Sequence, residues 1–320
     1  MTKKSLMLFS GRAHPELAEQ VAKQLDVTIT PQSAYSFANG EIFVRFEESV
    51  RGSDAFVLQS HSAPINDQIM EQLIMVDALK RASAKRISVV MPFWGYSRQD
   101  KKHRGREPIS ARLVADLFKV AGADRIMTVD LHTAQIQGFF DGPVDHLFAL
   151  PVLAEHVSRT YADHELTVVS PDSGRVRLAE RWAETLGGTP VAFIHKTRDP
   201  LQPNEVVAHR VVGEVAGRSC ILVDDMIDTG STIVSAARQL KDAGAADVIV
   251  VATHGILSGP AIDRLKNAPI NEVVLTNTLP IPPEKQIDGM TVLSIAPLIA
   301  RAIREVFEDG SVTSLFDGAS

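Results

Sequence analysis

The sequence has little of several features that would assign it to a familiar class of protein. It contains one cysteine, Cys220, so it cannot form an intrachain disulfide and fits a reducing compartment. No apolar run approaches the roughly 20 residues that a membrane span requires. The two lysines near the N-terminus are not followed by an apolar core of signal-peptide length. A formal charge of −6 argues against general binding of nucleic acid. We therefore expect a cytoplasmic protein without a membrane or nucleic-acid partner.

The 320 residues suit two domains better than one. Short β-branched runs alternate with segments of helical periodicity: residues 6–9 precede a helical pattern at 15–25, and residues 87–91 precede one at 109–121. The alternation restarts after Leu150. Continuous apolar strands between helices indicate an α/β protein with mostly parallel sheets that are covered on both faces.

The two halves of the sequence resemble each other. A strand ends in Val-Asp at 129–130 and again at 223–224, and an earlier strand in each half runs into a proline. We interpret the chain as a duplicated α/β domain, with domains at 1–148 and 149–304 and a C-terminal tail at 305–320. No linker is rich in glycine or serine, so we expect the domains to pack tightly.

The segment after Val223 combines an apolar strand, two acids and a polar turn before a helix. Gly230 allows a tight turn and the close approach of a ligand. The amides of residues 229–232 would point outward at a helix N-terminus, which is a ready anion site. The turn consists of Asp228, Thr229, Gly230, Ser231 and Thr232, and its hydroxyls add donors for phosphate oxygens. A turn whose Asp or Thr merely caps the helix is the alternative.

Asp224 and Asp225 directly follow the apolar strand. Their carboxylates would repel a phosphate at close range, so they need a different partner. A vicinal diol fits, because ionised carboxylates only accept hydrogen bonds and sugar hydroxyls donate them. Capping requires only one acid, so the pair favours a site for a phosphorylated sugar.

These residues resemble the phosphoribosyl diphosphate signature of the type I phosphoribosyltransferase fold. Further motifs along nearly the whole chain make it similar to the ribose-phosphate pyrophosphokinase family. The resemblance implies two phosphoribosyltransferase-like domains and transfer of the β,γ-diphosphate of ATP to the C1 hydroxyl of ribose 5-phosphate. The products would be 5-phosphoribosyl 1-diphosphate, for nucleotide biosynthesis, and AMP. In this family the acids at 224–225 would hold the ribose hydroxyls, and residues 228–232 the 5-phosphate.

In the first half the resemblance implies an ATP site. Residues 37–46 alternate around Asn39-Gly40 and predict a hairpin, and the segment Phe37, Ala38, Asn39, Gly40 and Glu41 resembles the family's adenine-contacting flap. Arg98 and Gln99 match residues that contact ATP. The loop at 97–106 matches a segment at subunit contacts and an effector site, for which phosphate and ADP are candidate effectors. The family's hexamers imply a homo-oligomer.

The resemblance also implies a Mg²⁺ site and a catalytic loop. Asp172 lies in a segment like the family's pyrophosphate loop, and a carboxylate beside pyrophosphate requires a cation between them. On spacing alone Asp172 could equally cap a helix. His132, in an Asp-Leu-His motif, matches a metal or ATP-phosphate ligand, although a lone histidine is more often structural. Lys196 and Arg198 match the outer members of a basic catalytic cluster, and Arg198 would also contact ribose 5-phosphate.

Several residues depart from the family pattern. Thr197 replaces the middle arginine of the catalytic cluster, so one charge is missing there. After Gly174 the family often continues with more glycine and then Arg-Ala, from which residues 175–179 depart slightly, and the roles of Arg175 and Arg177 stay open. Ser231 replaces a frequent glycine in the phosphate turn.

Three other functions compete with this interpretation. A nucleobase phosphoribosyltransferase would share the Asp-Asp loop but would not need the flap, Arg98 and Gln99, or His132. A non-catalytic regulatory relative would be expected to lose Lys196, Arg198 or His132, and all three are present. A DNA-binding regulator would need an added basic helical domain, which is absent from the sequence.

Overall fold

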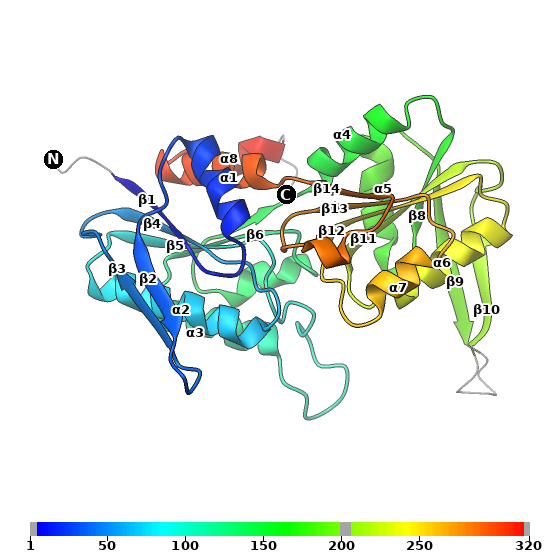
Figure 1. Cartoon of the computed structure of the whole chain (residues 1–320). Coiled ribbons are helices and arrows are strands. Elements are labelled where there is room, and N and C mark those ends of the chain that lie inside the picture. Colours follow the sequence, from blue (N-terminus) through cyan, green and yellow to red (C-terminus); the bar gives the residue numbers. More distant parts are fainter. Residues whose placement is uncertain (1–4, 199–205, 317–320) are drawn as a thin grey trace. The chain divides into compact units, whose positions relative to one another are not determined.

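The apolar runs of the sequence form the strands of two helix-flanked sheets (Figure 1). The computed structural model describes residues 5–198 and 206–316, with side chains throughout except at 196–198 and 206–209. Each sheet is the centre of one compact unit. The first unit holds the described residues up to Phe148, Thr278–Pro280 and the described residues from Ser294 onward, and the second holds the described parts of Ala149–Asn277 and Ile281–Leu293.

The described part of the first unit has a sheet of five parallel strands. In spatial order they are β1 (Leu6–Ser10), β4 (Asp54–Leu58), β5 (Arg86–Met91), β6 (Arg125–Val129) and β7 (Val144–Leu147). Helices α2 (Ile65–Arg81) and α3 (Ser110–Ala121) lie on one face, and α1 (Pro15–Leu25) and α8 (Ala296–Phe307) on the other (Figure 1). The short helices η1 (Ala134–Phe139) and η4 (Val312–Phe316) follow β6 and α8.

Helix α1 illustrates how the sequence sets these elements. Pro15 occupies its first turn, where a missing N–H costs nothing. Leu17, Val21 and Leu25 recur at helical spacing and are buried. The helix ends at Asp26, which has a left-handed conformation with φ of 58°. The buried face of α1 packs against α8.

A separate hairpin projects from the first unit. Strands β2 (Gln32–Ser36) and β3 (Ile42–Phe46) pair antiparallel in register across the turn at 37–41. Gly40 has a φ of 91°, which favours glycine at this turn. The prediction of a hairpin around Asn39-Gly40 is confirmed.

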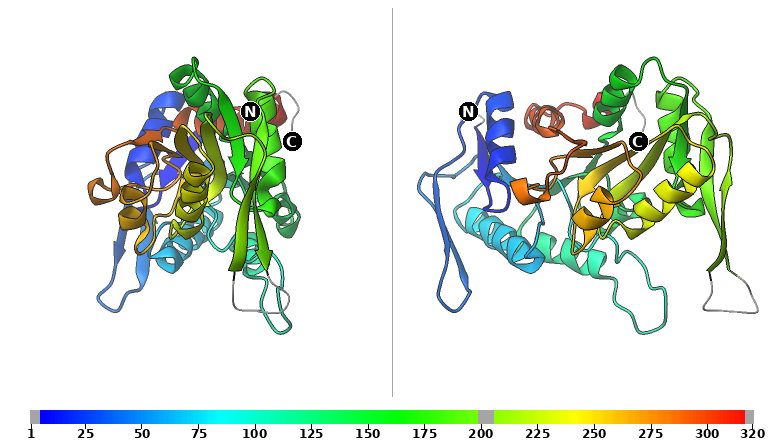
Figure 2. Two further views of the ribbon diagram at one scale, coloured as in Figure 1. Left: turned by 90° about the vertical axis from the view of Figure 1, so that its right-hand side faces the viewer. Right: turned by 45° about the vertical axis from the view of Figure 1, so that its right-hand side comes forward.

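The second unit has a sheet of seven strands in the described chain. Their order is β10 (Val206–Val212), β9 (Val191–Arg198), β8 (Leu166–Ser170), β11 (Ser219–Ile227), β12 (Asp247–Gly255), β13 (Glu272–Thr276) and β14 (Met290–Leu293). Only the edge strand β10 runs antiparallel to its neighbour. Figure 2 shows α4 (Leu150–Thr160) and α5 (Val176–Thr185) on one face, and α6 (Ser231–Asp242) and α7 (Ala261–Lys266) on the other. Two short helices complete the unit, η2 (Ser173–Arg175) and η3 (Pro283–Lys285).

The prediction of mostly parallel sheets flanked by helices is confirmed, and two strands are longer than predicted. β11 continues through both acids to Ile227, because it lies between β8 and β12 and its ladder with β12 runs to Gly255. β9 extends to Arg198 by pairing with β10, where the resemblance implied a loop. No helix among the described residues is long and apolar enough to cross a membrane.

The chain divides between the two units in a way that the sequence did not indicate. The change of unit after Phe148 matches the predicted junction, whereas the described residues from Ser294 onward join the first unit. That segment includes residues 296–304 of α8, which the predicted boundaries place in the C-terminal domain. The reason is that α8 buries its apolar face against α1.

Candidate functional site

Asp224 and Asp225 lie at the carboxyl end of β11, in the middle of the second sheet. This is the end of a parallel sheet at which ligands collect. Both side chains are largely shielded from solvent, with exposed fractions of 16% and 7%. The end of β11 thus places two adjacent carboxylates where solvent has little access.

The guanidinium of Arg175 contacts both of these acids. Its Nη2 lies 2.8 Å from Oδ1 of Asp225, and its Nε lies 3.5 Å from Oδ1 of Asp224. Burial, followed by the neighbouring Asp225, raises the pKa of Asp224 well above its usual value, and the charge of Arg175 opposes that shift. The two acids therefore form ion pairs with one arginine of the same chain, Arg175.

The turn after β11 has the form expected of an anion site. Gly230 is the N-cap residue of α6, has a φ of 73°, and leaves the helix without a side-chain cap. Asp228 accepts from the amide of Ser258 at 3.0 Å, and Thr229 accepts from Nη1 of Arg264 at 2.9 Å, both through their carbonyls. The alternative of a simple Asp or Thr side-chain cap is therefore wrong here.

The hydroxyl side chains of the same turn are exposed. Oγ1 of Thr229 lies 3.3 Å from Oγ of Ser231, and Thr232 follows in the first turn of α6. The first amides of a helix have no acceptor within it, and the helix dipole favours an anion there. The turn can thus present amide and hydroxyl donors to one phosphate group.

Asp172 follows β8, the strand next to β11. Its Oδ1 accepts from the amide of Gly174 at 2.8 Å, and its carbonyl accepts from Oγ of Ser170 at 2.6 Å. Asp172 therefore caps η2, whereas the N-cap residue of α5 is Arg175. This role leaves the carboxylate at the tip of the turn, half-buried.

The flap residues lie at the tip of the β2–β3 hairpin. Phe37 donates its amide to the carbonyl of Glu41 at 2.7 Å, and Oδ1 of Asn39 accepts from the amide of Glu41 at 3.1 Å. The ring of Phe37 is 47% exposed and lies 5.3 Å from that of Tyr35 and 6.1 Å from that of Phe43. The paired strands β2 and β3 thus hold the exposed ring of Phe37 at the tip of the hairpin.

Arg98 and Gln99 lie after β5 and are exposed. Oε1 of Gln99 accepts from Oγ of Ser110, the first residue of α3, at 2.6 Å. The next residue, Asp100, is buried, and its Oδ2 accepts from Thr133 at 2.7 Å and from Gln135 at 2.8 Å. The segment after β5 is therefore anchored to the segment after β6.

His132 lies in that second segment, half-buried, just beyond the end of β6. Asp130 has a φ of 38°, an uncommon left-handed value for a residue other than glycine. Leu131 donates its amide to Nε2 of His146 at 2.9 Å. The turn that presents His132 is thus held by a second histidine, on β7.

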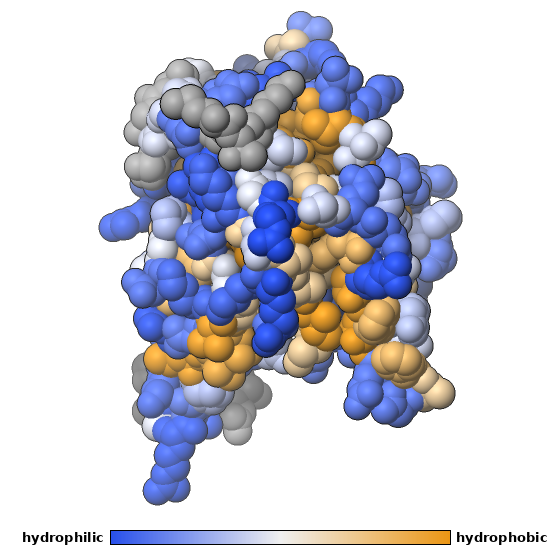
Figure 3. Space-filling model, turned by 90° about the vertical axis from the view of Figure 1, so that its left-hand side faces the viewer, coloured by the Kyte–Doolittle hydropathy of each residue, from blue (hydrophilic) through white to orange (hydrophobic). Residues whose placement is uncertain are grey.

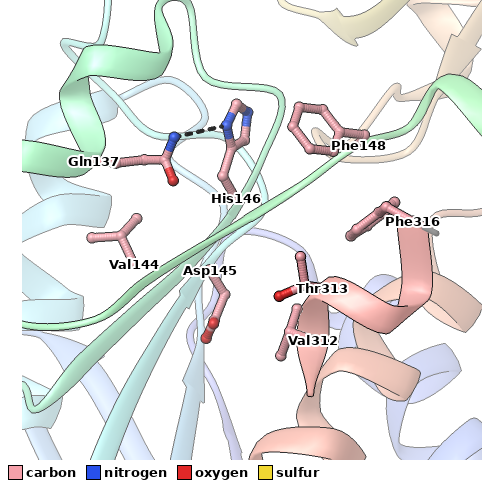
Figure 4. Close-up of a pocket in the computed structure, with 8 residues that line it drawn as sticks. All are labelled: Gln137, Val144, Asp145, His146, Phe148, Val312, Thr313 and Phe316. Carbon is pink, nitrogen blue, oxygen red and sulfur yellow. Dashed lines mark hydrogen bonds between the residues drawn. The ribbon is translucent and has the colours of Figure 1, made fainter. Parts of the chain in front are cut away.

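A pocket of about 130 Å³ lies beside His146 (Figure 4). It is lined by Gln137, Val144, Asp145, His146, Phe148, Val312, Thr313 and Phe316. Residues of β7 face residues of η4 across it, and the rings of Phe148 and Phe316 are 5.3 Å apart. Nε2 of Gln137 lies 3.5 Å from Nδ1 of His146.

Three residues of these sites escaped the sequence interpretation. Arg175 was noticed without a role, and His61 and His146 were missed. His61 is buried and lies three residues beyond Leu58, the last residue of β4, so its place just after an apolar run was the available signal. Nothing in the spacing marked His146, because β7 was not predicted.

Lys196 and Arg198 lie in the last part of β9. Their side chains fall outside the described residues, as do residues 199–205. Among the described residues, no group of three or more His, Cys, Asp or Glu side chains is placed to hold a metal ion. Cys220 is buried, as an apolar strand residue should be.

Comparisons with known proteins agree with one another. Residues 6–122 match the N-terminal domain of ribose phosphate pyrophosphokinase, and residues 167–317 match the phosphoribosyl synthetase-associated domain. The ribose-phosphate pyrophosphokinase of Mycobacterium tuberculosis H37Rv is 68% identical over 316 residues, covering 99% of this chain and 97% of that protein. That of Streptomyces coelicolor is 68% identical over 314 residues, covering 98% and 97%.

A solved structure extends the likeness to three dimensions. The crystal structure of phosphoribosylpyrophosphate synthetase from Mycobacterium smegmatis matches with a TM-score of 0.92 and 65% identity, covering 96% of this chain and all of that one. Sequence and fold therefore lead to the same conclusion: this chain belongs to the ribose-phosphate pyrophosphokinase family.

Proposed function

We propose that this enzyme transfers the β,γ-diphosphate of ATP to the C1 hydroxyl of ribose 5-phosphate, giving 5-phosphoribosyl 1-diphosphate and AMP. The observation that carries the proposal is the largely shielded pair Asp224 and Asp225 beside the turn at Gly230, whose amides begin α6. Two carboxylates suit the 2- and 3-hydroxyls of a ribose, and the turn suits its 5-phosphate.

The chemistry requires positioning more than a protein nucleophile. The C1 oxygen forms a bond to the β-phosphorus of ATP, and the bond from that phosphorus to the oxygen bridging to AMP breaks. Catalysis of such a transfer rests on alignment and on stabilising the charge of the transferring group. Asp224, Asp225 and the residues 228–232 would fix the acceptor so that its C1 hydroxyl is the only reactive group presented.

We assign ATP binding to the first unit. The exposed ring of Phe37 can stack on adenine, and Asn39 and Glu41 can hydrogen-bond its edge. Gly40 allows the tight turn that presents them. Arg98 and Gln99 would contact the nucleotide from the segment anchored by Asp100.

We propose Mg²⁺ as the cofactor, with Asp172 and His132 as its protein ligands. Mg²⁺ usually keeps several waters and binds through one or two carboxylates plus substrate phosphates. An imidazole is an uncommon donor for Mg²⁺, so His132 could instead donate to ATP phosphate oxygens. When bound, the ion would neutralise negative charge on the phosphates.

Lys196 and Arg198 are the proposed catalytic cations. They match the family's basic cluster by position, and β9 carries them toward the segment 199–205. Their role would be to stabilise the charge on the transferring diphosphate, and Arg198 would also contact ribose 5-phosphate. With Thr197 between them, this cluster carries two positive charges where the family pattern has three.

We further propose a cytoplasmic homo-oligomer, a hexamer by analogy with the family, that responds to phosphate and ADP through residues 97–106. Helix α3 offers a surface for assembly: Ile109, Leu113, Leu117 and Val120 form a stripe with exposed fractions of 37, 59, 42 and 77%. Such a stripe marks an interaction surface. Apolar patches also interrupt the hydrophilic face in Figure 3.

The decisive experiment measures AMP release from ATP by the purified enzyme. AMP should appear only when ribose 5-phosphate and Mg²⁺ are both present, and 5-phosphoribosyl 1-diphosphate should form in equal amount. AMP release without ribose 5-phosphate would contradict the transfer, and so would full turnover by Lys196→Ala. Formation of a nucleoside monophosphate from a free base would instead indicate a nucleobase phosphoribosyltransferase.

A further inference from the structure

We infer that Arg175 is a positioning residue for ribose 5-phosphate, and that it holds Asp224 and Asp225 as an aligned pair of ionised acceptors. The inference rests on the proposed role of these acids in binding the ribose hydroxyls. Its basis is one guanidinium that touches both carboxylates, at 2.8 Å and 3.5 Å.

The acidic pair needs a cation if both members are to accept hydrogen bonds. Two carboxylates that follow one another on a buried strand repel each other, and burial further disfavours their charged forms. A protonated carboxyl would donate to a sugar hydroxyl with one oxygen and so lose part of its accepting capacity. Arg175 supplies the compensating charge from within the chain.

Arginine suits this task better than lysine would. Its planar fork reaches two oxygens at once and keeps its charge at any physiological pH. Here Nη2 contacts Oδ1 of Asp225, and Nε contacts Oδ1 of Asp224. The side chain is 24% exposed, so the interaction is only partly screened by solvent.

The backbone of Arg175 ties this contact to the turn of Asp172. Arg175 is the last residue of η2 and the N-cap of α5, and its amide donates to the carbonyl of Asp172 at 3.4 Å. The main chain of Arg175 therefore holds the turn of Asp172, and its side chain aligns Asp224 and Asp225.

The test separates positioning from general damage. In Arg175→Gln and Arg175→Ala, KM for ribose 5-phosphate should rise about tenfold or more, as expected for a lost charge-assisted hydrogen bond. KM for ATP should change less than about threefold. Arg175→Lys keeps the charge and should lie between these variants and the wild type. Added guanidinium ion should lower the KM of Arg175→Ala toward the wild-type value.

Arg238→Gln is the matched control, because Arg238 is exposed on α6 and its loss removes the same charge from the same unit. Equal rises in both KM values, or an unchanged KM for ribose 5-phosphate in all three Arg175 variants, would overturn the inference. If Arg175→Ala does not fold, the Lys and Gln variants decide. A wild-type enzyme that lacks ribose 5-phosphate-dependent AMP release would instead refute the proposed function.

Discussion

Gly95 donates its backbone N–H to Nδ1 of His61 at 2.9 Å, and this bond ties the segment after β4 to the segment that carries Arg98 and Gln99. On the other side of the ring, Nε2 of His61 lies 2.9 Å from Oε1 of Gln72. Because Nδ1 accepts, the proton of the neutral ring sits on Nε2. Gln72 in turn donates to the carbonyls of Val57 and Val90.

This arrangement predicts a pH-dependent stability. Burial lowers the pKa of His61 from 6.5 to about 4. Between these values the unfolded chain binds a proton that the folded chain does not, so stability is full above pH 6.5 and falls as the pH drops toward 4. The pKa difference corresponds to a loss of about 3 kcal/mol. Urea unfolding of the wild type and of His61→Gln between pH 7 and 4 should show a steeper decline for the wild type. Parallel declines, or an imidazole that titrates near 6.5 by NMR, would refute the assignment.

A second prediction concerns the acidic pair. Asp224→Asn should lower kcat/KM for ribose 5-phosphate at least tenfold, because an amide offers one acceptor oxygen where the carboxylate offers two. The melting temperature should stay equal or rise, because the substitution removes a carboxylate that burial and the neighbouring Asp225 disfavour. Both effects already raise the pKa of Asp224. Steady-state kinetics and thermal melts on the same preparation check both parts. A lower melting temperature with unchanged kinetics would contradict both.

Gly230 provides a third prediction. Alanine at a φ of 73° costs about 1 kcal/mol of stability. The strained turn should also bind the 5-phosphate less well, so KM for ribose 5-phosphate should rise in Gly230→Ala. Gly187→Ala is the control, since Gly187 has a φ of 82° and open space around it, beyond the end of α5. The two variants should lose similar stability, and only Gly230→Ala should change the KM for ribose 5-phosphate. If both variants keep the same KM for ribose 5-phosphate, the turn at Gly230 does not bind its 5-phosphate.

A fourth prediction concerns the flap. Phe37→Ala should raise KM for ATP about tenfold, because stacking of a base on an aromatic ring contributes about 1–3 kcal/mol. Its effect on the melting temperature should be small, because nearly half of the side chain is exposed. Phe37→Tyr retains the ring and should retain the KM. A loss of ATP affinity in Phe37→Tyr as large as in Phe37→Ala would argue against stacking.

Local signals in the sequence predicted most of the elements that carry the candidate site. Helix α1 was predicted over its observed range because Pro15 starts it and its apolar positions repeat at helical spacing. The hairpin at Asn39-Gly40 was predicted from its turn residues. Residues 224, 225 and 230 were chosen as candidates because two acids and a glycine follow an apolar run, which is a pattern visible within a few residues.

Contacts between distant segments could not be predicted in this way. The strand was expected to end at 223–224, yet the ladder to β12 pairs Asp224 with Ala252 and continues to Ile227. Arg175 and Asp225 are fifty positions apart, and no periodicity relates them. The edge strand β10 was missed because His209 and Arg210 interrupt its apolar residues, so it lacks the continuous apolar run that marks a central strand.

Helix α8 has a consequence for the biosynthesis of the protein. It is made last among the long helices of the described chain, yet it covers α1, which is made first. While the ribosome is still completing residues 296–307, α1 lacks its neighbour α8 and the first unit lacks part of its core. The N-terminal half is therefore incomplete as a co-translational product, and a nascent chain stalled before Ser294 would expose to chaperones and proteases the apolar surface that α8 covers in the finished protein.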